Sequence, residues 1–464
     1  MGAPLPQGQR DAAGKNAVVA IAATASFLTP FMASSVNLAL PRIGQEFSMD
    51  AVLLGWVASS YLLAAAMFLV PFGRLADIHG RKRLFLCGMA VYSTSSLLVA
   101  VSPSAPLLIL FRAMQGTGGA MIFGTAVAIL TSAIPPEQRG RALGVNVAAV
   151  YLGLSLGPFV GGFLTQHFGW RSIFFINVPL GLTVVALALW RLKGEWAEAR
   201  GERFDLVGAV VYSLSLVALM YGFSRLPGAP GFVLVLLGLL GVTGFAWWES
   251  RSGSPVLNTG LFRRNTVFAF SNLAALVNYS ATAGVGFLLS LYLQYTKGLS
   301  PQNAGLVLVS QPVVMTVLSP FAGRLSDSIE PRAVASAGMA LTFVGLCLLA
   351  FLGEDTGLAF IVGSLVLLGF GFALFSSPNT NAVMSSVEKR FYGVASGTLG
   401  TMRLTGQMLS LGIVMIIFAV VIGRVEITPE YYHSFLVSAR IAFMVFAALC
   451  FGGIFASLAR GNVR

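Results

Sequence analysis

Charged residues are scarce in this sequence, and carboxylates are the scarcest of them. Only 10% of the 464 residues are charged, with 17 Asp and Glu against 29 Lys and Arg. A soluble globular chain has about 25% charged residues, so this chain lacks the charge to face water on all sides. The deficit excludes a water-soluble enzyme, a nucleic-acid-binding protein and a disordered chain. The net charge of +12 comes from basic residues that lie between apolar runs, which favours a membrane.

Cysteine is also rare. Cys87, Cys347 and Cys450 all lie within apolar runs, without the spacing of metal ligands or of a disulfide framework. We interpret them as small apolar residues, and we expect neither a metal site nor a cofactor. Residues 1–15 are polar and lack the short apolar core of a signal peptide, so the apolar run that follows is expected to be a retained membrane helix.

Long apolar runs dominate the rest of the chain. A hydrocarbon core of ~30 Å needs about 20 apolar residues in a helix, because only closed backbone hydrogen bonding is stable in lipid. The sequence therefore predicts an all-α integral membrane protein with fourteen transmembrane helices. The predicted spans are 16–38, 51–73, 83–102, 106–131, 141–166, 170–191, 204–226, 231–249, 265–294, 301–322, 331–351, 357–378, 392–422 and 435–458.

Lysine and arginine are divided unequally between the two sides of these spans. With a cytoplasmic N-terminus, the cytoplasmic segments hold 21 of the 29 Lys and Arg, and the outer loops hold five. Positive residues gather on the cytoplasmic side of membrane proteins, so both termini are expected to be cytoplasmic. The compact loops are typical of a bacterial inner-membrane protein.

Three arginines, Arg112, Arg403 and Arg440, are the charged residues expected at membrane depth, while all seventeen carboxylates lie in loops or at helix ends. An arginine at the centre of an isolated helix costs at least about 2.5–3.5 kcal/mol. We therefore expect these arginines to face a protein interior or a wet cavity.

A short element recurs in the two halves of the chain. The loop after the second span contains Gly73-Arg-Leu-Ala-Asp77, and the loop after the tenth contains Gly323-Arg-Leu-Ser-Asp327. The repeat predicts two six-helix bundles, which is typical of secondary transporters with a cavity between the halves. The predicted order is a cytoplasmic tail (1–15), a six-helix bundle (16–191), an inserted two-helix hairpin (204–249) and a second six-helix bundle (265–458).

The first of these loops identifies a family. From Gly73 to Arg81 it resembles the loop motif of the major facilitator superfamily, and the whole chain resembles the fourteen-span drug:proton antiporters (multidrug efflux) of that superfamily. The resemblance implies the major facilitator fold and a cytoplasmic latch, formed by Gly73, Asp77 and Arg81, that holds the outward-open state. Gly73 is expected to let helices 2 and 11 approach, and Asp77 can pair with arginine. Asp327 is expected to take the gating role in the second half.

The predicted fourth span contains Arg112-Ala-Met-Gln115-Gly, which resembles the family's R-x-x-Q-G motif. The resemblance assigns proton coupling to Arg112, with Gln115 as its hydrogen-bonding neighbour. A buried guanidinium keeps its charge and shifts the pKa of nearby groups. The alternative is a packing helix of small residues that carries one arginine.

The predicted fifth span resembles the antiporter motif G-x-x-x-G-P-x-x-G-G, which in this superfamily marks exporters. Glycines spaced by four residues make a smooth helix face for close packing, and the proline adds a kink. The residues that match the motif are Gly153, Gly157, Pro158, Gly161 and Gly162.

The first span departs from the family pattern, which is approximately Asp-x-Thr-Ile-Val-Asn-x-Ala-Leu-Pro. Asn37 and the following Ala39-Leu40-Pro41 match it, but Met32 stands where relatives have an aspartate that is expected to carry protons or attract cationic drugs. Without a deep carboxylate, a desolvated cation has no partner. We therefore expect a neutral to positive cavity and neutral, amphiphilic or anionic cargo.

Polar and aromatic residues near mid-span depth are candidates to line this cavity, although each can instead form a hydrogen bond between helices. They are Asn37, Tyr61, Asn272, Asn278, Tyr279, Tyr292, Gln311, Arg403 and Gln407.

These features predict a monomeric secondary active exporter of small amphiphilic molecules, which works by alternating access in exchange for protons. Its expected partners are the cargo, protons and the lipid bilayer. The alternative within transport is a proton-independent facilitator or exchanger of an amphiphilic or lipid-like substrate, which Met32 favours. A membrane-embedded enzyme would need a carboxylate pair, a histidine cluster or a nucleophile motif, and a channel would need a repeated polar lining; the sequence shows neither. A non-transporting scaffold would not need the latch and the antiporter motif.

Overall fold

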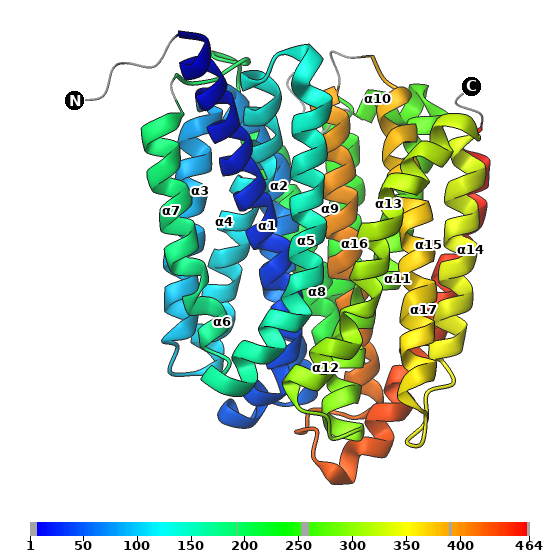
Figure 1. Cartoon of the computed structure of the whole chain (residues 1–464). Coiled ribbons are helices and arrows are strands. Elements are labelled where there is room, and N and C mark those ends of the chain that lie inside the picture. The colour runs from blue at the N-terminus through cyan, green and yellow to red at the C-terminus, as the bar shows by residue number, and fades with distance from the viewer. Residues whose placement is uncertain (1–6, 193, 252–258, 389–391, 462–464) are drawn as a thin grey trace.

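The computed structural model describes residues 7–192, 194–251, 259–388 and 392–461, and this part of the chain folds into helices without a strand. Fourteen helical segments are long and apolar enough to cross a membrane, as predicted. The start of α1 at Gln7 and the end of α17 at Ala459 lie at one face of the bundle (Figure 1), which we call the terminal face. The opposite face is called the far face. The all-α membrane fold is confirmed.

The first half of the molecule contains six spans. Their helices are α1 (Gln7–Phe47), α2 (Ala51–His79), α3 (Arg81–Ala100), α4 (Ala105–Ala133), α5 (Pro136–Phe168), and α6 (Ser172–Phe175) with α7 (Asn177–Arg191). α1 begins inside the predicted tail 1–15, so the helix extends farther from the membrane than its apolar run. The Pro-rich turn at 102–106 separates α3 from α4, as the sequence predicts.

Two helices follow, and a second half of six spans completes the chain. The two helices are α8 (Leu206–Arg225) and α9 (Ala229–Glu249). The second half consists of α10 (Thr259–Arg264), α11 (Thr266–Leu291) with η1 (Tyr292–Thr296), α12 (Pro301–Leu308), α13 (Ser310–Ser328), α14 (Pro331–Leu349), α15 (Leu358–Ser385), α16 (Tyr392–Val421), η3 (Pro429–Tyr431) and α17 (Tyr432–Ala459). The predicted span 301–322 is divided between α12 and α13, because Pro312 has no N–H to continue the helical ladder.

Carboxylates begin two of the helices. Asp50 accepts a hydrogen bond from the Leu53 amide at 2.7 Å at the start of α2. Asp205 accepts one from the Gly208 amide at 2.8 Å at the start of α8. Each such cap stabilises its helix by about 1 kcal/mol, and the helix dipole favours a negative charge there. The carboxylates therefore serve at helix ends, which agrees with their absence from the middle of the predicted spans.

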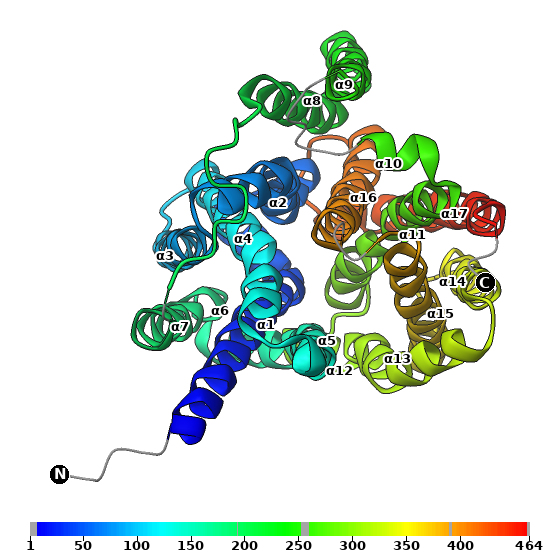
Figure 2. The same ribbon diagram turned by 90° about the horizontal axis from the view of Figure 1, so that it is seen from above.

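The two halves lie side by side, and the α8–α9 hairpin lies outside the edge formed by α2 and α16 (Figure 2). α9 is the outermost of the two. Only 17% of its most apolar stretch is buried, compared with 72% for α2 and for the span of α11 and η1. The side chains of α9 therefore face lipid, whereas α2 and α11 belong to the interior.

α5 packs closely against α1 through its glycines. A Cβ atom at Gly157 would lie 2.9 Å from the Phe31 carbonyl oxygen, and one at Gly161 would lie 2.7 Å from the Ser35 Cα atom. The Ser35 hydroxyl donates a hydrogen bond to the Gly157 carbonyl oxygen at 3.0 Å. Because these neighbours are backbone atoms, they cannot move aside as a long side chain can. Only glycine permits this helix–helix distance.

Substitution of Gly161 by alanine is expected to destabilise the protein, because its Cβ atom would overlap the α1 backbone. Overpacking of this kind costs about 1–3 kcal/mol, so the apparent Tm of the purified protein should fall by several degrees. The matched control is Gly144→Ala on the same helix, where a Cβ atom meets nothing within 4 Å. The control should leave Tm unchanged or raise it, since alanine is the better helix former. An equal Tm for both variants would contradict the packing role.

Candidate functional site

The two halves contact each other at the far face along three seams. Between α5 and α12, a Cβ atom at Gly162 would lie 2.4 Å from the Pro301 carbonyl oxygen. Between α1 and α11, the Ser290 hydroxyl donates a hydrogen bond to the Asn37 carbonyl oxygen at 2.6 Å. Between α2 and the segment after α16, the Ala51 amide donates one to the Val425 carbonyl oxygen at 3.0 Å. At each of these seams the two halves are in close contact, and the backbone takes part in all three.

Toward the terminal face the halves separate. α2 and α16 still meet where a Cβ atom at Gly400 would lie 3.3 Å from the Leu69 side chain. One turn farther along each helix, Gly73 and Gly397 have open space where a Cβ atom would stand. Gly73 was expected to let helices 2 and 11 approach. When the spans of the two halves are counted together without α8 and α9, these helices are α2 and α16. In this structure α2 and α16 approach each other at Gly55 and Gly400, not at Gly73. The contacts between the halves thus gather at the far face and become fewer toward the terminal face.

The predicted latch residues bind a segment of their own half. Residues 194–205, called the linker below, lead from α7 to α8 across the loop between α2 and α3. The Arg81 guanidinium forms ion pairs with Asp77 at 2.7 Å and with Glu198 of the linker at 2.8 Å. The Arg81 amide donates to the Trp196 carbonyl oxygen at 2.9 Å, and the linker's Ala199 amide donates to the Asp77 carbonyl oxygen at 2.9 Å. Among the described residues, the latch joins the loop to the linker and makes no ion pair with the other half.

The equivalent residue of the second half cannot be compared in the same way. Asp327 lies on α13 close to its terminal-face end, but its side chain is outside the described residues. The linker contacts were not foreseen from the sequence, where residues 191–205 read only as a charged connection. The linker is not helical, so the spacing of its glutamates gives no signal of these contacts.

Arg112 is enclosed within the first half and has neutral partners. It is 1% exposed, and its Nε atom donates a hydrogen bond to the Val57 carbonyl oxygen of α2 at 3.0 Å. An Nη1 hydrogen bond goes to the Gln115 Oε1 atom, and Gln115 Nε2 donates in turn to the Ser96 hydroxyl of α3 at 2.7 Å. The guanidinium carbon lies 4.8 Å from the ring centre of Tyr61. The structure thus brings Arg112, Gln115 and Tyr61 together.

Tyr61 belongs to this network and not to the space between the halves. It is 5% exposed, and its ring packs against α4, where a Cβ atom at Gly119 would lie 2.6 Å from the tyrosine hydroxyl. A tyrosine face attracts a cation by about 0.5–2 kcal/mol. The interaction offsets part of the cost of keeping the Arg112 charge in a site that, among the described residues, has no carboxylate partner.

A second arginine lies between the halves at mid-depth. Arg403 is in the middle third of α16 and is partly exposed. Its Nη2 atom donates a hydrogen bond to the Thr380 hydroxyl of α15 at 2.7 Å, and its guanidinium carbon lies 5.7 Å from the ring centre of Tyr279 on α11. Gln407, four residues farther along α16, lies on the same helix face. One turn before Arg403 on α16, a Cβ atom at Gly400 would lie 3.3 Å from the Leu69 side chain of α2, so this part of α16 borders the first half.

The structure does not bring the other predicted cavity residues into this group. Asn37 lies at the α1–α11 seam, where a Cβ atom at Gly286 would be 3.5 Å from its Nδ2 atom. Gln311 lies where α13 crosses α15 at Gly369. Asn278 is fully buried within the second half, and neither of its side-chain polar atoms has a hydrogen-bond partner among the described residues. Polar residues that were predicted at the same membrane depth therefore lie in different parts of the structure.

Two other predicted cavity residues have structural roles. Asn272 is buried, and its Nδ2 atom donates to the Phe268 carbonyl oxygen of its own helix at 2.9 Å. Tyr292 is buried at the far face, where its hydroxyl donates to the Gly353 carbonyl oxygen at 2.7 Å.

Arg440 faces the protein interior at a helix end, and a further arginine was missed in the sequence. Arg440 Nε donates a hydrogen bond to the Leu352 carbonyl oxygen in the far-face loop after α14, so its charge lies at a helix end and not in the cavity. Arg460, counted as a loop residue in the sequence, is fully buried at the terminal-face end of α17. It donates to Asn379 Oδ1 at 3.1 Å, and burial lowers its pKa to about 10. Its place depends on α15, so nothing near Arg460 in the sequence indicates it.

The inserted hairpin also contacts both halves. On α8, the Tyr212 hydroxyl donates a hydrogen bond to the Ala66 carbonyl oxygen of α2 at 3.3 Å. Arg424, which follows α16, donates to the Ser224 carbonyl oxygen of α8 at 2.8 Å. α8 therefore covers the α2–α16 seam from the lipid side.

The sequence matches one family model over most of its length. Residues 22–205 and 268–462 match the model described as Major Facilitator Superfamily. The two matched segments correspond to the two halves of the structure and leave out α8 and α9. The fold agrees with this match: a solved peptide transporter POT in complex with sulfate superposes with a TM-score of 0.70 at 15% identity, covering 97% of this chain and 98% of that chain.

Curated relatives narrow the assignment. The chain is 32% identical over 384 residues to the multidrug resistance protein Stp of Mycobacterium tuberculosis (strain CDC 1551 / Oshkosh), covering 82% of this chain and 71% of that protein. It is 34% identical over 405 residues to the cephamycin export protein CmcT of Amycolatopsis lactamdurans, covering 85% and 83%. It is also 27% identical over 428 residues to the riboflavin transporter RibZ of Clostridioides difficile (strain 630), covering 92% and 93%. The chain therefore belongs to the Major Facilitator Superfamily of transporters, and within it to the drug-efflux family.

Proposed function

We propose that this transporter exports small amphiphilic molecules in exchange for protons, by alternating access, and that its cargo is neutral or anionic. The observation that carries the cargo class is Arg403. Its guanidinium is partly exposed between the halves at mid-depth, beside Tyr279, and among the described residues no carboxylate contacts it. A cationic molecule that lost its water there would meet a positive charge without a counter-ion, whereas an anionic or neutral aromatic molecule would meet a guanidinium and a ring.

The terminal face is proposed to be the cytoplasmic one. The segments that reach this face hold 21 of the 29 Lys and Arg, and the far-face loops hold five, a distribution that favours the cytoplasm for the richer side. The contacts between the halves then gather at the outer side, and in this state the cargo would enter from the cytoplasm.

Export as the direction rests on two supports. The α5 residues that resemble the antiporter motif form the packing against α1 and the far-face seam with α12. Two of the relatives are named as a multidrug resistance protein and an export protein. A relative named as a riboflavin transporter adds that an aromatic, polar cargo is compatible with this family of sequences.

A second candidate function is transport without protons. Met32 is fully buried on α1 at the position where relatives have an acidic residue. With this residue apolar, and with the carboxylates at the helix ends, the proton carrier expected of an antiporter is absent from the first span. A facilitator or exchanger of the same amphiphilic cargo needs no such carrier.

The first prediction separates these two functions in proteoliposomes that contain the purified protein and a pH-sensitive dye. An imposed proton gradient is followed while a neutral amphiphile, a quaternary ammonium or a sulfonate is added. The sulfonate stays ionised and carries no protons passively. We expect the neutral molecule and the sulfonate to move and to trigger proton flux. Cargo movement without proton flux would establish the second candidate, and strong transport of the quaternary ammonium would overturn the cargo class.

The second prediction concerns Arg403. Arg403→Gln removes a charge-assisted contact worth about 1.5–3 kcal/mol, so the apparent affinity for the sulfonate should fall at least about tenfold. The affinity for the neutral amphiphile should change much less. Arg225→Gln, which removes an exposed far-face arginine that stacks on Tyr221, is the control for net charge. If both substitutions lower sulfonate affinity equally, Arg403 is not part of the cargo site.

The third prediction tests alternating access. The hydroxyl oxygens of Ser155 on α5 and Thr316 on α13 lie 3.0 Å apart between the halves, so cysteines at both positions should form a disulfide. In a background without Cys87, Cys347 and Cys450, the oxidised double variant should bind cargo but not transport it. Reduction should restore transport, and each single cysteine variant serves as a control. Full transport by the cross-linked protein would exclude a mechanism in which these halves separate.

A further inference from the structure

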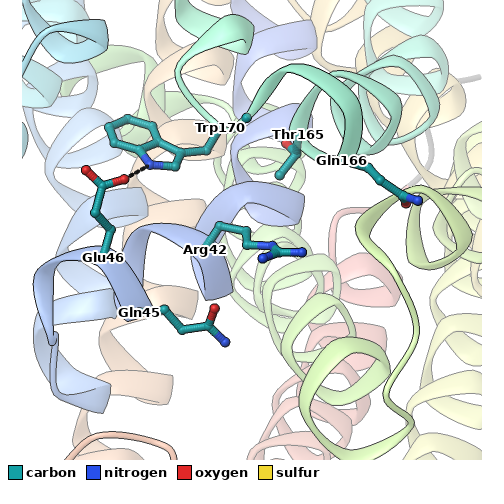
Figure 3. A pocket seen from close by; sticks show the side chains of 7 residues that line it. Arg42, Gln45, Glu46, Thr165, Gln166 and Trp170 are labelled. Atoms are coloured by element: carbon teal, nitrogen blue, oxygen red, sulfur yellow. Dashed lines mark hydrogen bonds between the residues drawn. The ribbon is translucent and has the colours of Figure 1, made fainter.

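A cavity of about 440 Å³ lies at the far face, beside the seam between α5 and α12. It is formed where the last turns of α1 and α5 diverge, and its walls include Arg42, Gln45, Thr165 and Gln166 (Figure 3). Glu46 and Trp170 close one side of it. Ligand cavities in proteins are typically about 300–1,000 Å³, so this one can hold a small organic molecule.

The carboxylate in this cavity is already neutralised. Glu46 accepts a hydrogen bond from the Trp170 indole N–H at 2.7 Å, and it pairs with both Nη atoms of Arg171. This pairing raises the pKa of the Arg171 guanidinium. Glu46 therefore does not compensate another charge in the cavity.

Arg42 supplies the uncompensated charge. Its side chain is exposed and extends into the cavity (Figure 3), and among the described residues it has no hydrogen-bond or ion-pair partner. The planar guanidinium offers parallel N–H donors that match the two oxygens of a carboxylate. The cavity thus carries a free positive charge whose geometry suits an oxyanion.

Thr165 gives an independent sign of a missing ligand. It is 3% exposed, it lines the cavity, and its Oγ1 atom has no hydrogen-bond partner among the described residues. A buried hydroxyl without a partner costs about 1–3 kcal/mol. Beside it, the Gln166 Oε1 atom accepts a hydrogen bond from the Gln302 amide at 3.3 Å, which leaves the Gln166 amide N–H groups as donors.

We propose that this cavity binds a small molecule that bears a carboxylate, at the face opposite the termini. Arg42 holds the two carboxylate oxygens, and the Thr165 hydroxyl and the Gln166 amide donate hydrogen bonds to it or to a polar group beside it. The site is separate from the Arg403 group at mid-depth. It therefore does not depend on the proposed cargo or on proton coupling.

The site is linked to the conformation of the transporter. Gln302 belongs to α12 of the second half, and it contacts both Gln166 and the His167 ring, which lies 3.0 Å from its Oε1 atom. The wall that holds Gln166 in place is complete only while the far-face ends of α5 and α12 stay together. A ligand that binds this arrangement better than the separated one stabilises the far-face-closed state.

Calorimetric titration with benzoate tests the site in the Arg403→Gln background, which removes the guanidinium of the proposed cargo site. We expect saturable binding of benzoate and no binding of neutral benzamide. Adding Arg42→Gln should weaken benzoate binding at least about tenfold, whereas Arg225→Gln should leave it unchanged. Equal binding of benzamide, or equal effects of the two arginine substitutions, would overturn the proposal.

Thr165→Val separates ligand contact from folding. Because the Thr165 hydroxyl has no partner in the described structure, valine should leave the Tm of the unliganded protein unchanged or raise it. Benzoate binding should nevertheless weaken several-fold. Unchanged benzoate affinity in a stable Thr165→Val variant would remove the hydroxyl from the site. Binding should also persist in the oxidised Ser155→Cys/Thr316→Cys protein, and its loss there would contradict the link to the far-face-closed state.

Discussion

The close approach that glycine permits along α5 is the constraint on which the rest of this structure depends. On one face of the helix, Gly157 and Gly161 admit the α1 backbone; on another, Pro158 and Gly162 admit α12 of the second half. One helix therefore sets both the internal packing of the first half and the far-face seam. Because closely packed backbones are not continuously deformable, this geometry favours movement of the halves as units.

The positions of the charged residues follow from the cost of placing a charge in lipid. The described carboxylates lie in loops or at helix ends, where they cap helices, as Asp50 does, or pair with arginine, as Glu46 does. Arginines enter the interior with neutral partners: Arg112 has a backbone carbonyl, an amide and a tyrosine ring, and Arg403 has a hydroxyl and a tyrosine ring. The interior is therefore biased to positive potential, and the two arginines differ in that Arg403 alone is partly exposed between the halves.

The linker and α8, which connect the two halves along the chain, also form specific contacts with them. The linker supplies Glu198 to the Arg81–Asp77 pair, so the loop between α2 and α3 is held from its own half. α8 then contacts α2 through Tyr212, and Arg424 after α16 contacts α8. If α2 and α16 separate at the far face, α8 must therefore lose its contact with one of them or move together with both.

The number, order and approximate limits of the spans could be predicted from the sequence, because a helix in lipid satisfies its own backbone and its length and hydropathy are local properties. The surroundings of each polar residue could not. Tyr61 and Tyr279 look alike in the sequence, yet one packs beside Arg112 inside the first half and the other faces the space between the halves. The burial of Arg460 could not be predicted either, because a long side chain reaches whichever carbonyl or amide its neighbouring helices provide. Those partners are set by packing between helices far apart in the chain, which only the tertiary structure decides.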